Sequence, residues 1–229
     1  MEKYSNSIKA RFTARHQKCI NLVGNVKRKK ILNIGCYNGW FEQMMVKKGA
    51  KEIVGIDTNE KFIIMAQKNV PEVKFFKMSV LGLNFSKEYF DLITMFDVIE
   101  HLPKGTEVKA FKGINKILKA NGKVVVSTPN NHFLANILDP AWYFGHRHYK
   151  EEQLKKMLGK SGFKIEKMEK RGGFFEMISA ILLYIFKWIF RREVPFKKFL
   201  EQKRDKEYLV NKNGFMTIFI KVVANEKDF

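Results

Sequence analysis

The sequence has few cysteines, no long apolar segment at its beginning and no internal repeat. Two cysteines, Cys19 and Cys36, occur among 229 residues, which excludes a disulfide framework and favours a reducing compartment. Residues 1–7 lack the apolar run of a secretory signal peptide. At 229 residues and without a low-complexity linker, the chain is expected to form one domain, 1–229. The two cysteines and the beginning of the sequence lead us to expect it in the cytoplasm.

Acidic residues are outnumbered by basic ones. The chain carries 23 Asp and Glu against 43 Lys and Arg, a formal net charge of +20. Such an excess occurs on ordinary solvated surfaces, and it also attracts nucleic acid or an anionic membrane. Because no RNA-recognition signature accompanies the charge, nucleic acid is the partner that we favour least.

A glycine turn at 35–39 follows the apolar run 31–34 and precedes a helical pattern. Glycine lets the backbone turn sharply or approach a ligand, and such turns after buried parallel strands bind nucleotides. The next apolar run, 52–56, leads into Asp57, whose carboxylate is placed to accept hydrogen bonds from ribose hydroxyls. Tyr37 stands between the two glycines, which argues against the three-glycine fingerprint of dinucleotide sites. The pattern therefore predicts a nucleoside site.

Apolar runs of strand length alternate with helical patterns along most of the chain. The predicted strands are 31–34, 52–56, 73–77, 90–95, 122–128, 162–169 and 214–223. The predicted helices are 6–24, 39–48, 59–69, 106–119 and 151–160. Strands that alternate with helices favour parallel pairing in a doubly wound α/β sheet.

Four features occur in a fixed order: the glycine turn 35–39, Asp57, the segment 97–102, and Gly122 before the run 124–129. Together they resemble the class I S-adenosylmethionine-dependent methyltransferases, in particular the branch with the ubiquinone-biosynthesis O-methyltransferases. The resemblance implies an α/β fold with a doubly wound, seven-stranded, mostly parallel sheet. It also implies an antiparallel edge strand, and here a helical insertion precedes that strand.

The resemblance implies that S-adenosylmethionine is the cofactor. Its binding positions would be Asn33, Gly35, Cys36, Tyr37, Gly39, Asp57, Thr58, Ser79, Val80 and Phe96. Three of them depart from the family, which usually has Asp at the position of Asn33, Gly at that of Tyr37 and often an acid at that of Ser79. Asn33 can accept a hydrogen bond, but it brings no charge for the ammonium group of the cofactor.

Histidines and acids near the ends of the fourth and fifth predicted strands are the catalytic candidates. Asp97, Glu100 and His101 match the family positions that hold a divalent cation, and their oxygen and nitrogen atoms suit Mg or another divalent ion. The same Glu-His pair is widespread in family members without a metal. His101, His146 and His148 are candidate catalytic residues, because a histidine can take a proton from a hydroxyl acceptor.

The segment 174–190 is nearly all apolar, and Arg191 and Arg192 follow it. With seventeen residues and two charges it is short for a membrane-spanning helix. Its wide apolar face is compatible with three roles. The segment 174–192 would lie as a helix in the plane of an anionic membrane, cap the core, or form a dimer interface. We divide the domain into a helical segment 1–29, a core 30–170, an insertion 173–207 and a final edge strand within 208–229.

The leading interpretation is an enzyme that transfers a methyl group from S-adenosylmethionine to a hydroxyl of a small or lipid-linked acceptor. It would be cytoplasmic, with peripheral contact to the membrane. The alternative is a degenerate protein with the same fold that acts as a membrane-binding or partner-binding scaffold. Calorimetry with S-adenosylmethionine distinguishes the two, because the scaffold need not bind it.

Overall fold

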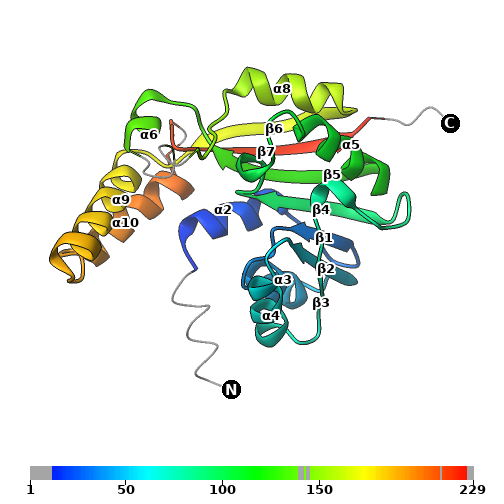
Figure 1. Cartoon of the computed structure of the whole chain (residues 1–229), viewed down its shortest axis with the longest axis horizontal. Coiled ribbons are helices and arrows are strands. Elements are labelled where there is room, and N and C mark those ends of the chain that lie inside the picture. The colour runs from blue at the N-terminus through cyan, green and yellow to red at the C-terminus, as the bar shows by residue number, and fades with distance from the viewer. Residues whose placement is uncertain (1–11, 139–141, 143–144, 212, 226–229) are drawn as a thin grey trace.

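The computed structural model describes residues 12–138, 142, 145–211 and 213–225. The strands of this part of the chain are β1 (Lys30–Ile34), β2 (Glu52–Asp57), β3 (Lys74–Lys77), β4 (Phe90–Phe96), β5 (Leu118–Pro129), β6 (Phe163–Arg171) and β7 (Thr217–Ala224). They form one sheet in the order β3-β2-β1-β4-β5-β7-β6 (Figure 1). β7 pairs antiparallel with β5 and β6, and the other pairs are parallel.

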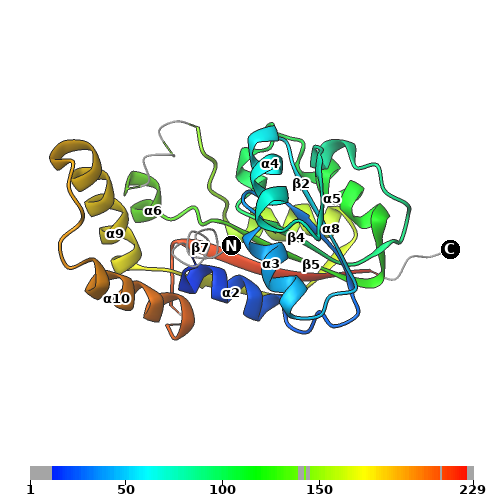
Figure 2. The ribbon, with the colours of Figure 1, turned by 90° about the horizontal axis from the view of Figure 1, so that it is seen from below.

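Helices cover both faces of the sheet. They are α2 (Ala14–Val23), α3 (Trp40–Lys47), α4 (Glu60–Asn69), α5 (Glu107–Ile117), α6 (Phe133–Leu138), α8 (Glu151–Lys160), α9 (Phe174–Ile185) and α10 (Lys197–Leu209). Two 3₁₀ turns, η1 (Val80–Gly82) and η2 (Ile99–His101), follow β3 and β4, and a π-helical turn η3 (Phe186–Phe190) extends α9. In the two views, α2, α3 and α4 lie on one face of the sheet and α5 and α8 on the other (Figures 1 and 2).

The core consists of two apolar layers, one on each face of the sheet. Neighbouring residues of β1 enter different layers: Ile31 packs with α2, α3 and α4, whereas Leu32 packs with α5 and α8. Because a central parallel strand is buried on both faces, it has a nearly continuous apolar run rather than an alternating one. This pattern explains why the strands were readable from the sequence.

The predicted fold class is confirmed, and each predicted strand overlaps an observed one. The antiparallel strand β7 lies one place in from the edge, and β6 forms the edge itself. Two helix boundaries differ by more than one residue. The first helix begins at Ala14, with residues 6–11 outside the described part, and the helix predicted to reach 119 ends at Ile117, because buried Leu118 pairs with Phe90 in the sheet.

The insertion between β6 and β7 forms a helical hairpin, here named the α9–α10 hairpin and covering 174–209. It extends away from one end of the sheet, and α10 also packs on α2 (Figure 2). Among the described helices, none is long and apolar enough to cross a membrane. At the root of the hairpin, the Glu207 carboxylate accepts the backbone N–H groups of Gly173, Phe175 and Glu176 at 2.8–3.0 Å. This contact caps the beginning of α9 and ties it to α10.

Candidate active site

The carboxyl ends of the central strands meet at one edge of the sheet. Ile34 at the end of β1 pairs with Ile56 of β2 and with Met95 of β4. Immediately beyond these residues lies a cavity of about 770 Å³, lined from α2, the glycine turn and the ends of β2 and β4, together with η1 and η2. Open α/β sheets bind their ligands at this edge, so the cavity is the candidate active site.

The glycine turn forms one wall of the cavity. Gly35 has a φ of 81°, in the left-handed region, and its N–H donates to the Ile56 carbonyl at 2.8 Å. A Cβ atom on Gly35 would lie 2.4 Å from Cγ2 of Val98, so no larger residue fits there without displacement. The turn therefore brings bare backbone to the cavity.

Asp57 lies at the end of β2, facing the same cavity. Its Oδ1 accepts the Asn59 N–H at 2.9 Å, and its Oδ2 accepts the Tyr37 N–H at 3.3 Å. The two backbone donors hold the carboxylate in one orientation between the glycine turn and the start of α4. Each of its oxygens has a second lone pair for ligand hydroxyls.

Helix α2 supplies a wall that sequence reasoning missed. Arg15 and His16 both line the cavity. The Arg15 guanidinium lies 2.6 Å from Oδ1 of Asp97, which also accepts the Ser127 hydroxyl at 3.0 Å. His16 packs edge-on against Trp40, 4.4 Å between ring centres, and burial together with the charge of Arg15 lowers its pKa to about 4. The His16 ring is therefore neutral near pH 7.

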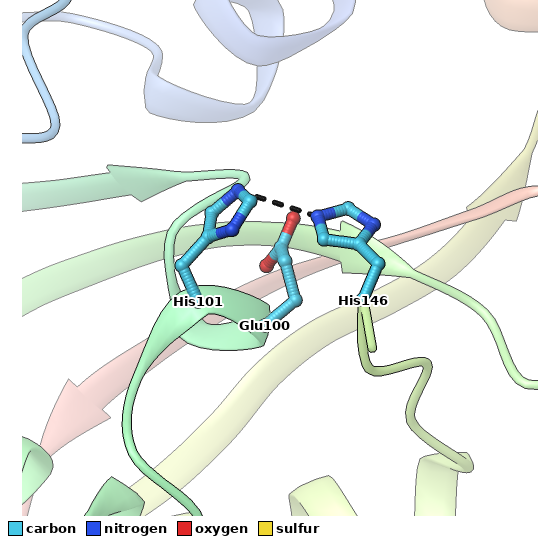
Figure 3. A group of neighbouring side chains, drawn as sticks. All are labelled: Glu100, His101 and His146. Carbon is cyan, nitrogen blue, oxygen red and sulfur yellow. Dashed lines mark hydrogen bonds between the residues drawn. The ribbon is translucent and has the colours of Figure 1, made fainter. Parts of the chain in front are cut away.

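Beside this wall, Glu100, His101 and His146 converge (Figure 3). The Nε2 atoms of the two histidines lie 3.3 Å apart, a hydrogen bond whose donor depends on the tautomers. The Glu100 carboxylate is buried, and its Oε2 accepts the Thr128 hydroxyl at 3.0 Å. Burial and the neighbouring Asp97 raise the pKa of Glu100 to about 8.

Arg147 explains how two distant segments come together in this cluster. Its guanidinium donates to the Glu107 carboxylate and to the carbonyls of Ile99 and Leu102. These bonds fasten the segment that carries His146 to η2, which carries His101.

Comparison with known proteins agrees with this geometry. Residues 8–168 match a family model described as a methyltransferase domain. The chain belongs to this methyltransferase-domain family. The predicted resemblance is confirmed.

Individual relatives and solved structures are also similar to this methyltransferase domain. The ubiquinone biosynthesis O-methyltransferase of Nitrosomonas europaea is 27% identical over 116 residues, 48% of this chain and 48% of the relative. The chain thus spans about half the length of the curated relatives that it matches. An S-adenosylmethionine-dependent methyltransferase from Mesorhizobium loti superposes with a TM-score of 0.66 at 17% identity, over 92% of this chain and 98% of that one. The cyclase SpnF superposes with 0.68 at 16% identity, over 92% and 82%. Both structures show a shared fold.

Most of the predicted cofactor positions of this methyltransferase domain lie around one cavity. The lining includes Asn33, Gly35, Tyr37, Asp57, Thr58, Ser79, Val80 and Phe96. Cys36 and Gly39 are not part of the lining: Cys36 is fully buried behind the turn, and Gly39 begins α3 against Ala66. The Tyr37 ring packs edge-on against Phe62, with 4.7 Å between the ring centres, so the ring forms part of the cavity wall.

Asn33 lines the cavity, but its polar atoms are used inside the protein. Its Nδ2 donates to Oε1 of Glu42 at 2.8 Å, and its Oδ1 accepts the Thr94 hydroxyl at 2.8 Å. Glu42 is fully buried, and burial raises its pKa to about 8. Sequence reasoning missed Glu42, although an acid in a mostly apolar helix, next to Phe41 and three residues before Met45, was a signal for a buried carboxyl.

The three candidate catalytic histidines separate into two groups. His101 lines the cavity and contacts His146. His148 is buried, with Nδ1 2.7 Å from Oδ1 of Asn136, and it is not among the lining residues. The expected cation ligands also separate, because Asp97 is engaged by Arg15, whereas Glu100 and His101 gather with His146.

Proposed function

We propose that the protein transfers a methyl group from S-adenosylmethionine to a hydroxyl of a small or lipid-linked acceptor. The observation that carries this proposal is that the Gly35 turn, Asp57 and His101 line one cavity. Membership of the methyltransferase-domain family supports the transfer. The hydroxyl acceptor is supported by relatives named ubiquinone biosynthesis O-methyltransferase.

The residues on one side of the cavity suit the nucleoside part of S-adenosylmethionine. Gly35 leaves room for close approach of the ligand to the backbone, and the Asp57 carboxylate can accept both ribose hydroxyls. Phe96 and Trp40 offer aromatic surface beside them. When bound, S-adenosylmethionine supplies an electrophilic methyl group, and the protein then contributes mainly by positioning.

On the other side, His101 is the proposed general base. An imidazole nitrogen of His101 would take the proton of the acceptor hydroxyl as its oxygen bonds to the methyl carbon and the methyl–sulfur bond breaks, with the demethylated cofactor leaving as a neutral thioether. His146, hydrogen-bonded through Nε2, holds the His101 ring in its orientation. His148 contributes indirectly, by holding the chain next to His146 through Asn136.

A second candidate role for this cluster is cation binding. Each of Glu100, His101 and His146 offers one ligand atom, and these three atoms all lie within 4.8 Å of one another. Two imidazoles and one carboxylate suit a transition metal better than Mg, which prefers oxygen ligands. Titration of the protein with Zn²⁺ or Mn²⁺, followed by calorimetry, tests this role. Binding that is unchanged in His146→Ala would exclude it.

The competing interpretation is a scaffold that keeps the fold without the activity. The internal bonds of Asn33 favour it, because they occupy Nδ2 and one of the two lone pairs of Oδ1, which leaves one uncharged acceptor position for the cofactor ammonium. Calorimetry with S-adenosylmethionine decides between the two. We expect binding that weakens by about 1.5–3 kcal/mol in Asp57→Ala, the range for hydrogen bonds to a charged group.

Ser86→Ala serves as the control for that measurement, because Ser86 is exposed and lies outside the cavity lining. Equal affinity of wild type and Asp57→Ala would refute the nucleoside site. Absence of binding by the wild type, with its fold intact by circular dichroism, would favour the scaffold.

A further inference from the structure

The α9–α10 hairpin begins at the same edge of the sheet as the candidate active site. Pro129 at the end of β5 and Arg171 at the end of β6 both pair with Thr217 at the start of β7. The chain between Arg171 and Thr217, which contains the hairpin, therefore leaves the sheet where the parallel strands open into the cavity. Figure 2 shows the hairpin projecting from this end, with α2 beside its root.

The far end of the hairpin, here named the tip and covering 186–199, exposes large apolar side chains. Their exposed fractions run from 53% to 81% for Trp188, Ile189, Phe190, Phe196 and Phe199. Scattered exposed apolar residues are ordinary in proteins, but a contiguous cluster marks a surface that contacts a partner or a membrane. Trp and Phe favour the headgroup level of a bilayer.

Basic side chains surround these apolar ones. Arg191, Arg192, Lys197 and Lys198 are all exposed at the tip, where Glu193 is the acid among 186–199. A groove of about 510 Å³ is lined by the basic residues Arg191, Arg192, Lys197 and Arg204, by the acids Glu193 and Glu201, and by apolar residues that include Leu183 and Leu200. Basic side chains therefore line a groove that includes part of the tip.

The root holds the hairpin in place. Glu207 caps α9 through three backbone N–H groups, and the Arg204 guanidinium lies 3.7 Å from the Glu176 carboxylate. Tyr208 is almost fully buried against Phe219 of the sheet. A surface that is fixed in this way keeps its orientation relative to the cavity.

We propose that the α9–α10 hairpin docks on an anionic lipid bilayer, with the apolar tip among the headgroups and lipid phosphates in the basic groove. Charge selects this occupant over a second copy of the chain. Two copies would bring like-charged tips together on molecules of net charge +20, whereas an anionic bilayer attracts them. The tip is also a projecting end, which suits insertion into headgroups.

Docking deepens the proposed function, and the following consequence rests on it. Because the hairpin leaves the sheet at the same edge as the cavity, a docked protein keeps the cavity on the edge of the sheet that faces the bilayer. The acceptor is then an amphiphile whose apolar part stays in the bilayer, while its hydroxyl reaches beyond the headgroups to the cavity. Acceptors of this kind need not dissolve in water to reach His101.

Vesicle flotation of the full chain tests docking without cofactor or acceptor. The vesicles are phosphatidylcholine alone or phosphatidylcholine mixed with phosphatidylglycerol, at low and high salt. We expect flotation with the anionic vesicles, decreasing as salt rises. Removal of two groove cations in Arg192→Ala/Lys197→Ala should weaken binding by about 25-fold, at about fivefold per cation. Lys47→Ala/Lys48→Ala, which removes two exposed cations elsewhere, should bind like the wild type.

The apolar contribution is tested with Ile189→Ser/Phe196→Asn. Asn suits position 196, where φ is 55°, and both side chains are mostly exposed, so the fold should persist. We expect binding to fall by about tenfold or more. Ile64→Ser, at a similarly exposed position on α4, is the matched control.

Docking would be overturned if the wild type did not float at low salt, or if the control variants lost as much binding as the tip variants. It would also be overturned if the protein did not bind vesicles but self-associated, and the tip variants abolished that self-association. The last result would assign the tip to a second copy. Binding of S-adenosylmethionine is measured in parallel by calorimetry. A wild type that floats but binds no S-adenosylmethionine would refute the proposed function and leave docking standing. A wild type that binds S-adenosylmethionine but does not float would refute docking and leave the proposed function standing.

Discussion

Replacement of Glu42 by Gln should change how the stability of the protein depends on pH. Glu42 is fully buried beneath the glycine turn, and its Oε1 accepts the Asn33 amide at 2.8 Å. Its Oε2 has no hydrogen-bond partner in the described part of the chain. Burial raises the pKa from 4.5 to about 8, because it outweighs the hydrogen bonds from Asn33 and from the backbone that favour the charged form.

The sign follows from proton linkage. In the interval between the two pKa values the folded state holds a proton on Glu42 that the unfolded state has lost. The free energy of unfolding therefore falls as pH rises from 4.5 towards 8. Between about pH 5.5 and about pH 8 the fall amounts to about 3 kcal/mol, from the population of the two protonation states. Gln keeps the carbonyl acceptor for Asn33 and cannot ionise, so the variant loses this fall.

Urea unfolding of wild type and Glu42→Gln at a series of pH values measures the effect. His16 titrates in the opposite sense, because its lowered pKa makes stability rise with pH, and this contribution cancels in the difference between the two proteins. We expect the two proteins to be about equally stable near pH 4.5 and the variant to be more stable near pH 8. Parallel profiles would mean that Glu42 ionises normally and that the site is hydrated.

Three further predictions concern the cavity and the hairpin. Gly35→Ala should destabilise the fold by about 1–3 kcal/mol and weaken S-adenosylmethionine binding, because its Cβ meets Val98; unchanged unfolding and affinity would contradict the turn geometry. His101→Ala should lower turnover by about 10²–10⁴ once an acceptor is known while leaving cofactor affinity unchanged by calorimetry; full turnover would leave positioning alone as the source of catalysis. Glu207→Gln should weaken the cap on α9 and cost about 1–3 kcal/mol of unfolding free energy, seen also as faster amide exchange at 173–176; equal exchange would show that packing alone holds the root.

The sequence by itself determined the sheet and half of the candidate site. Strand positions followed from nearly continuous apolar runs, because parallel strands buried on both faces consist mostly of apolar residues. The Gly35 turn and Asp57 could also be predicted from the sequence. They lie at the ends of β1 and β2, which are consecutive in the sequence and pair with each other in the sheet. Family resemblance added the antiparallel pairing at one edge of the sheet, which local patterns do not contain.

Tertiary structure decided which polar groups meet. Arg15 reaches Asp97 across 82 positions of the chain, and His101 meets His146 across 45. No local period records such pairs, because they depend on how helices and loops settle against the finished sheet. The same holds for Glu42, whose burial redirects Asn33 into the core. Local sequence fixes backbone geometry through sterics and burial, whereas side-chain chemistry at a site depends on the neighbours that folding supplies from elsewhere.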